Sequence, residues 1–190
     1  MTSTSPRRVD PDRKARIVDA ALDVIAEHGV AGTTHRVVAA AADVPLGSMT
    51  YHFENLDELL RLAFERHAVQ AAARFEAAMA TVPEGGDPVE AIVGLVCDES
   101  GNYRRDLLVA LELYVLAARK PAFRTVTQRW MAASRAALRR HVDAEVAPDV
   151  DALLEGLVLH AALSTGSDGR PLDRPLDPER VRRAVRRQVG

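Results

Sequence analysis

The chain has 190 residues, enough for one large domain or two smaller ones, and its 47% hydrophobic and 27% charged residues are typical of a globular protein. Aromatic residues are only 4%, while Ala, Leu, Val and Arg abound, which favours helices and makes an all-β fold unlikely. The net charge of −2 excludes an argument for nucleic-acid binding from overall charge, so any such argument must rest on local features.

Cysteine content and hydropathy narrow the setting of the protein. Its single cysteine, Cys97, excludes an internal disulfide and fits a reducing compartment. No apolar run approaches the roughly 20 residues that a membrane-spanning helix needs, and residues 1–14 lack the apolar core of a signal peptide. We therefore expect a cytoplasmic protein without a membrane segment.

The first segments of the chain are a polar tail and an amphipathic helix. Residues 1–10 are mostly small and polar and are expected to form a disordered basic arm. Apolar residues then recur at helical spacing over about 11–28, and Gly29 is expected to end this helix. Basic residues bunch at 7–16, where a flexible arm could follow DNA into a minor groove; the alternative is a solvated terminus.

The next segment, residues 33–53, predicts two short helices joined by a tight turn. Either Thr33 or Thr34 can cap the first helix. In the turn Asp43 tolerates a left-handed backbone, and Pro45 suits the first turn of the second helix. The second helix is too short to be stable alone, so its neighbours must hold it. A helix-turn-helix unit presents its second helix to a DNA major groove in this way.

The remaining chain predicts further helices and no strand. A fourth helix over 54–82 carries one apolar face and ends where prolines and glycines begin. Five more helical segments follow in residues 83–190, with breaks at prolines such as Pro121 and Pro148. The fold class is therefore all-α, with about nine helices: a three-helix unit over 11–53, the fourth helix, and a helical body.

The run from Gly47 to Phe53 reads GSMTYHF, follows the Ala-rich helix and turn, and precedes a long helix that begins near Asn55. This order resembles the TetR family of bacterial transcriptional regulators, most specifically over residues 13–62. The resemblance implies a helix-turn-helix DNA-binding domain followed by a ligand-binding and dimerisation domain. It also implies a regulator, most simply a repressor, that binds double-stranded operator DNA as a homodimer and is released by a small-molecule effector.

The resemblance assigns DNA contacts residue by residue. Tyr51 and His52 match the pair that contacts phosphate at the end of the recognition helix, whereas Phe53 is interpreted as a core anchor. Two residues depart from the family pattern: Asp43 stands where glycine is common, and Leu56 where lysine is common. Leu56 would leave Asn55 and the first amides of the fourth helix to meet phosphate. The predicted DNA contacts are Thr34, Arg36, Pro45, Leu46, Gly47, Ser48, Thr50, Tyr51, His52 and Asn55.

The body carries weaker signals. Candidate ligand contacts, each alternatively ordinary core, are Phe64, His67, Phe75, Cys97, Tyr103, Tyr114, Trp130 and Met131. The few aromatic residues favour an aliphatic pocket over a cage for flat cations. The resemblance places the dimer interface on the helices at about 122–146 and 150–165, although their apolar faces could instead be internal core. The candidates there are Leu153, Leu154, Leu157, Val158 and Ala161.

Two other classes of protein were weighed against this reading. The sequence has no metalloprotease, nucleophile-elbow or phosphate-loop motif, and its six histidines show no repeated metal spacing, so we expect no enzyme, cofactor or metal site. A helical ligand-binding or adaptor protein without DNA binding is the stronger alternative. Leu56 favours it, as does the balance of six basic and six acidic residues over residues 1–53.

Overall fold

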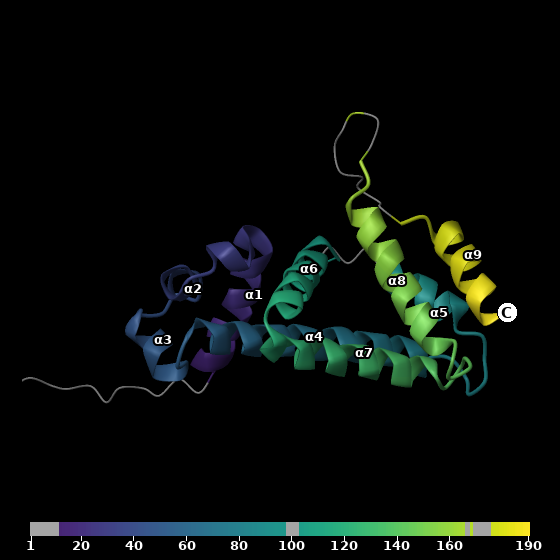
Figure 1. Ribbon diagram of the computed structural model, residues 1–190, viewed down its shortest axis with the longest axis horizontal. Coiled ribbons are helices and arrows are strands. Elements are labelled where there is room, and N and C mark those ends of the chain that lie inside the picture. The colour runs from purple at the N-terminus through teal and green to yellow at the C-terminus, as the bar shows by residue number, and fades with distance from the viewer. Residues whose placement is uncertain (1–11, 98–102, 166–167, 169–175) are drawn as a thin grey trace, which may run out of the picture. The chain divides into compact units, whose positions relative to one another are not determined.

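The computed structural model describes residues 12–97, 103–165, 168 and 176–190. Within these residues the fold is all-α, as the sequence predicts, with nine α-helices and one 3-10 turn (Figure 1). In chain order they are α1 (Arg13–Gly32), α2 (His35–Ala41), α3 (Gly47–His52), α4 (Leu56–Ala80), α5 (Val89–Val96), α6 (Tyr103–Arg119), η1 (Pro121–Phe123), α7 (Arg124–Leu138), α8 (Ala147–Ala162) and α9 (Pro178–Val189). The predicted arm of residues 1–10 lies outside the described residues.

Internal contacts divide the chain into two compact units, residues 1–63 and residues 64–190, called here the first and the second unit. The division falls inside α4, whereas the sequence-based boundary at residue 53 precedes this helix. The difference has a physical reason: Leu59, Leu60 and Ala63 in the first turns of α4 are already buried. These turns therefore belong with the three shorter helices before them.

In the first unit, α1 is interrupted at the predicted position. Gly29 has φ 68°, in the left-handed region that glycine adopts without steric cost, and helical residues continue only to Gly32. The Thr33 hydroxyl then donates a hydrogen bond of 2.8 Å to the Gly29 carbonyl oxygen. Gly29 thus ends the amphipathic part of α1, whose buried stripe consists of Ile17, Val18, Ala20, Ala21, Leu22, Val24 and Ile25.

The six-residue helix α3 is held by two buried side chains. Met49 is fully buried in its middle, and Phe53, directly after its last residue, is 2% exposed. The ammonium group of Lys14, from α1, lies 5.4 Å from the centre of the Phe53 ring, a cation–π contact. Phe53 is therefore a core anchor, as the sequence indicated, and a helix too short to be stable alone is fixed by its neighbours.

The second unit has its own core, in which α5 packs against α9, and α8 packs against both α7 and α9. Pro148 and Pro178 stand in the first turns of α8 and α9, where the missing N–H loses no helical hydrogen bond. Pro148 thus lies inside its helix rather than before it, and α7 ends at Leu138 instead of the expected position near 146. The buried cluster comprises Met79, Val89, Ile92, Val93, Val96, Ala137, Leu138, Ala147, Val150, Leu154, Leu157, Val181 and Val185.

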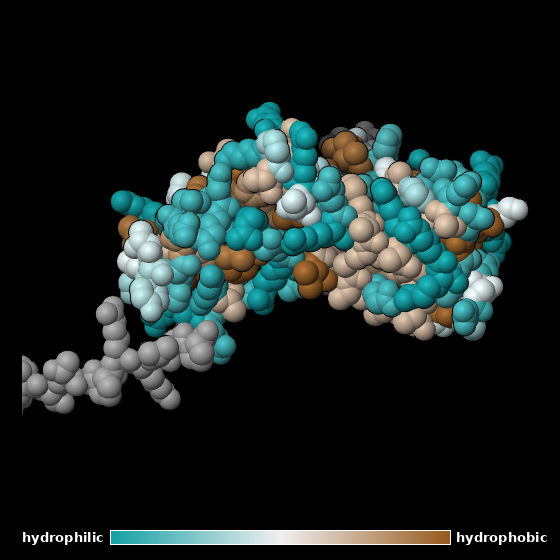
Figure 2. All heavy atoms as spheres, turned by 60° about the horizontal axis from the view of Figure 1, so that its bottom comes forward, coloured by the Kyte–Doolittle hydropathy of each residue, from teal (hydrophilic) through white to brown (hydrophobic). Residues whose placement is uncertain are grey.

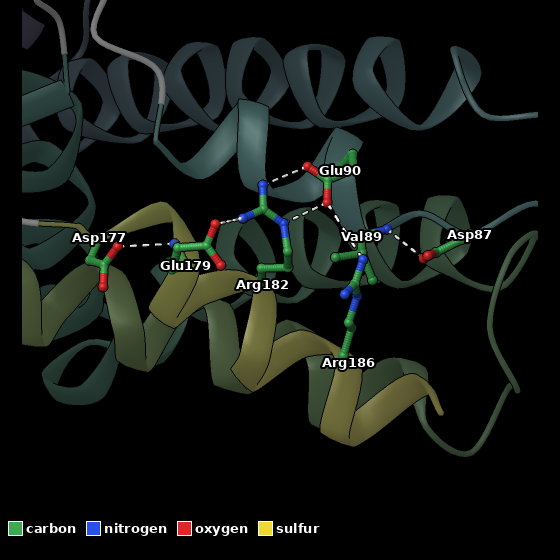
Figure 3. A network of polar contacts seen from close by, with 7 residues as sticks. All are labelled: Asp87, Val89, Glu90, Asp177, Glu179, Arg182 and Arg186. Carbon is green, nitrogen blue, oxygen red and sulfur yellow. Dashed lines mark hydrogen bonds and ion pairs between the residues drawn. The ribbon is translucent and has the colours of Figure 1, made fainter.

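A polar network ties α9 to α5 (Figure 3). Arg182 donates to both carboxylate oxygens of Glu90, at 2.6 and 2.8 Å, and to Glu179 at 2.6 Å. The backbone N–H of Glu179 donates to the Asp177 carboxylate, which caps α9. The basic face of this last helix is thus anchored over the valines that it buries.

Large hydrophobic side chains are seldom exposed. Figure 2 shows a face on which strongly hydrophobic residues form small separate groups among hydrophilic ones. Two of the exposed large hydrophobic residues, Leu46 at 48% and Tyr51 at 82%, belong to the predicted DNA-contacting segment. The others are Val69, Val115 and Leu163. None of the helices in the described ranges combines the length and the apolar character that crossing a bilayer requires.

Candidate functional site

The turn between α2 and α3 shows how the local sequence positions the second helix. The Thr34 side chain caps α2 by accepting a hydrogen bond of 3.2 Å from the Val37 N–H, so Thr34, not Thr33, is the cap. Asp43 adopts the expected left-handed backbone, with φ 51°. The Ser48 N–H then donates to the Pro45 carbonyl oxygen at 2.8 Å, which starts the turn leading into α3. Small polar residues and one proline therefore fix this turn.

The residues predicted to contact DNA lie on the surface of the first unit. Eight of the ten are exposed, and Ser48 and His52 are half-buried. Among the described residues Arg36 forms no ion pair, so its guanidinium group is available to a partner. The Thr50 hydroxyl donates to the Gly47 carbonyl oxygen at 3.2 Å. A β-carbon added at Gly47 would have no neighbour within 4 Å, so the protein itself does not require glycine there.

The start of α4 differs from the expectation. The Glu58 N–H donates to the Asn55 side-chain oxygen at 2.9 Å, and the Glu54 N–H donates to the Glu58 carboxylate at 2.7 Å. These two amides are therefore occupied, and the acidic Asp57 and Glu58 in the first turn disfavour a phosphate there. The Asn55 NH₂ group remains as a donor, while the half-buried Leu56 offers no charge.

The second unit contains a cavity of about 520 Å³. Four of the candidate ligand contacts line it, namely His67, Phe75, Tyr114 and Trp130. Phe64 does not, because it is fully buried and packs edge-to-face against Phe123, with ring centres 6.2 Å apart. The remaining lining residues are Ala71, Arg74, Leu95, Val96, Asp106, Leu107, Ala110, Leu111, Ala152, Glu155, Gly156, Val158 and Leu159.

Three further candidates have other places. Cys97 packs partly buried against the core of the second unit, and burial raises the pKa of its thiol. Met131 is half-buried on α7 and does not line the cavity. The Tyr103 side chain lies outside the described part of the structure. Helical spacing places such residues on apolar stripes but does not separate cavity wall from core.

Aromatic rings gather at the cavity. The Tyr114 and Trp130 rings are stacked, with centres 5.9 Å apart and planes 20° from parallel. The His67 imidazole meets Trp130 edge-on, with ring centres 5.5 Å apart. The expectation of a purely aliphatic pocket is therefore wrong. It rested on composition, which says how many aromatic residues the chain has and not where the fold collects them.

Charged side chains also reach the cavity wall. Arg74 donates to Asp106 at 2.6 Å, and Asp106 lies 3.9 Å from the His67 ring. Burial lowers the pKa of His67 to about 4, against the opposing attraction of Asp106, so the imidazole is neutral near pH 7. The Tyr114 hydroxyl donates to Glu155 at 2.6 Å, and burial raises the pKa of this carboxyl. Arg74, Asp106 and Glu155 gave no sequence signal, because charged residues on helices usually face solvent.

The five residues predicted for the dimer interface lie on α8. Leu154, Leu157 and Ala161 are buried within the subunit, and Leu153 and Val158 pack partly buried against the core. Val158 also lines the cavity. For the three buried residues the alternative interpretation, internal core, fits the structure, because they leave little surface for a partner.

Comparison with known proteins places the chain in a family. Models for the bacterial regulatory proteins of the tetR family and for the tetracyclin repressor-like C-terminal domain match residues 17–63 and 83–190. The chain belongs to the TetR family. BetI, an HTH-type transcriptional regulator of Escherichia coli O157:H7, is 27% identical over 86% of this chain and 87% of its own.

Solved structures support the same TetR assignment. A transcriptional regulator of Streptomyces coelicolor A3(2) is 41% identical, with a TM-score of 0.82 over 95% of this chain and 99% of that chain. The multidrug binding protein EbrR, complexed with ethidium, is 34% identical, with a TM-score of 0.73 over 94% and 99%. This TetR protein is thus a DNA-binding transcriptional regulator, and the alternative without DNA binding is not favoured.

The TetR relatives named here are regulators rather than enzymes. Among the residues that the structure describes, no group of three or more His, Cys, Asp or Glu side chains could hold a metal ion.

Proposed function

We propose that this protein is a repressor that binds operator DNA as a homodimer and releases it when a small molecule occupies the cavity of the second unit. One observation carries the proposal: the 25-residue helix α4 contributes to both units. Its first turns supply the buried Leu59 and Ala63, and its later turns supply His67 and Ala71 to the cavity wall. A ligand that displaces one end of a helix can therefore act on the other.

In this proposal α3 enters the major groove. Gly47 lets the backbone approach the duplex, Leu46 contacts a thymine methyl group, and Tyr51 and His52 hold phosphates. The Thr34 oxygen caps α2, which leaves its hydroxyl proton free to donate to a phosphate. The exposure of these side chains and the open space at Gly47 support the proposal.

Dimerisation follows from the size of α3, because six residues contact too few base pairs for specificity. Two copies on a two-fold operator double the contacts, with half-site centres about 34–36 Å apart. We place the interface on the part of α8 that does not pack inside the subunit, continuing to Leu163, which is 70% exposed just after this helix.

The cavity is proposed as the effector site. EbrR is complexed with ethidium, proflavin and malachite green in separate structures, which supports an organic aromatic effector for this relative. The effector must bind the DNA-free state more tightly than the DNA-bound state. Such coupling typically amounts to about 1–3 kcal/mol, which lowers DNA affinity by roughly 5- to 150-fold.

Selection from random duplex DNA with the purified full chain tests this function. We expect a two-fold symmetric sequence whose binding weakens steeply with salt. Tyr51→Ala and His52→Ala should each weaken binding without changing the particle mass, which light scattering measures as that of a dimer. Failure to enrich any sequence would overturn the DNA-binding role, and a monomer at micromolar concentration would overturn the dimer.

A further inference from the structure

The carboxylate of Glu155 stands out in the cavity wall because no cation is paired with it in the described part of the chain. Its one recorded partner there is the Tyr114 hydroxyl, at 2.6 Å. The other carboxylate of the wall, Asp106, has Arg74 at 2.6 Å and Arg105 at 3.3 Å. A neutral hydroxyl orients a carboxylate but does not cancel its charge.

The nearest basic group does not change this balance. Arg135 of α7 is held by Asp151 at 2.9 Å, so its charge is already matched. Burial and the neighbouring Asp151 raise the pKa of Glu155, while Tyr114 and Arg135 oppose this change. The charge of Glu155 is therefore costly in the free protein, as expected for a partly buried carboxylate without a counter-ion.

The whole wall has the same sign. Arg74 compensates Asp106, and His67 is neutral near pH 7, which leaves the wall with one net negative charge, that of Glu155. A cation in the cavity would gain the attraction of this carboxylate in a partly desolvated place. An anion would meet repulsion, and a neutral molecule would leave Glu155 unpaired.

The rest of the wall suits a flat ring system. Tyr114, which donates to Glu155, is stacked on Trp130, so the carboxylate and the aromatic faces adjoin. Aromatic faces attract cations and stack on other rings. Leu107, Leu111 and Leu159 add aliphatic surface, and a volume of about 520 Å³ lies within the usual range for drug-sized ligands.

We propose that the cavity binds a flat aromatic cation, with its positive charge against Glu155 and its rings beside Tyr114 and Trp130. This inference rests on the proposed function in taking the cavity as the effector site. It adds the charge of the ligand and the residue that selects for it. Binding can be measured without DNA, so the two proposals can fail separately.

The full chain carries its own reporter, because Trp130 is its single tryptophan and lines the cavity. Proflavin, a cation at mildly alkaline pH, and acridine, the same ring system uncharged there, are matched probes. We expect saturable quenching of Trp130 emission by proflavin and, by calorimetry, at least tenfold tighter binding of proflavin than of acridine. The anionic anilinonaphthalene sulfonate should bind most weakly.

Glu155→Gln tests the assignment of the residue. The amide keeps the shape of the side chain and can still accept from Tyr114, but it has no charge. We expect it to weaken proflavin binding at least tenfold and to leave acridine binding nearly unchanged. Glu145→Gln makes the same change at an exposed position away from the cavity and should alter neither.

Equal affinity for proflavin and acridine on the unmodified chain would overturn the inference, with no need of a variant. Tight proflavin binding that survives Glu155→Gln in a folded protein would overturn it as well. If proflavin binds as expected but operator DNA is not released, the proposed induction fails and the inference stands. If a neutral molecule releases DNA and proflavin does not bind, the inference fails and the proposed function stands.

Discussion

The DNA-contacting segment and the cavity are built in opposite ways. The first comes from one continuous stretch, residues 34–55, whose side chains are mostly exposed and leave donors available. The second collects residues from five helices, α4 to α8, between His67 and Leu159, and several of them are bonded to one another. A surface that reads DNA needs only a rigid short helix, whereas a cavity needs a tertiary core. Changes in the two regions should therefore have separable effects.

The largest effect should come from Phe53→Ala, which removes the anchor of α3. Truncating a buried phenylalanine destabilises a fold by about 3–5 kcal/mol, and α3 cannot persist without its packing. We expect DNA binding to be lost while Trp130 emission and proflavin binding persist. Calorimetric unfolding should show the first unit melting at lower temperature.

Phe123→Ala is the matched control, because Phe123 is equally buried but lies in the second unit. It should shift the transition that Trp130 emission follows and leave the other in place. If Phe53→Ala also abolished ligand binding, the two units would not be separable.

The next largest effect concerns pH and the second unit. His67 has a pKa of about 4 in the fold against 6.5 in the unfolded chain, because burial disfavours its charged form. Between these values the unfolded chain binds the additional proton, so stability falls as pH decreases from about 6.5 towards 4. At 1.36 kcal/mol per pKa unit the full loss is about 3 kcal/mol.

Urea unfolding followed by Trp130 emission at several pH values measures this loss. His67→Gln should remove that part of the pH dependence, and comparing the two proteins at each pH cancels the contributions of carboxylates. His160→Gln, at an exposed position, should retain it. An unchanged slope in His67→Gln would refute the role of buried His67.

Three glycines sharpen the comparison with smaller effects. A β-carbon at Gly47, Gly94 or Gly156 would meet no atom within 4 Å, so alanine fits each site in the free protein. Gly47→Ala should weaken operator binding about tenfold, or about 1.4 kcal/mol, because its methyl group would meet the duplex. Gly156→Ala should alter proflavin binding only, since Gly156 lines the cavity.

Gly94→Ala, at an exposed position of α5, should change neither activity and should stabilise its helix by up to about 1 kcal/mol. Fluorescence anisotropy with operator DNA and calorimetry with proflavin measure the two activities. Operator binding by Gly47→Ala that equals that of Gly94→Ala would argue against close approach of the backbone at Gly47.

Sequence was most informative where structure is local. The break at Gly29, the left-handed Asp43 and the anchoring role of Phe53 each follow from a residue type and its immediate neighbours. The choice between Thr33 and Thr34 as cap did not, because both side chains can accept the same kind of hydrogen bond. Only the fold shows that the Thr33 hydroxyl is engaged with Gly29.

The cavity was predictable only in part, since its key contacts join distant positions. Arg74 and Asp106 are 32 residues apart, and Tyr114 and Glu155 are 41 apart, so no spacing rule links them. Phe64 and His67 lie on the same apolar stripe of α4, yet one is core and the other is cavity wall. In the same way, an apolar pattern on α8 could not separate a dimer surface from internal packing.

The smallest effect should come from Arg182→Ala, although this side chain makes the most conspicuous polar contacts of the second unit (Figure 3). Arg182 joins Glu90, 92 residues away, but Glu90 is 62% exposed, so water and salt screen their attraction. We expect a slightly lower urea midpoint, which vanishes in high salt. Val181→Ala removes a fully buried neighbour on the same helix and should destabilise by about 2 kcal/mol at any salt concentration. If Arg182→Ala were as damaging as Val181→Ala, the network rather than the valines would hold α9 on the second unit.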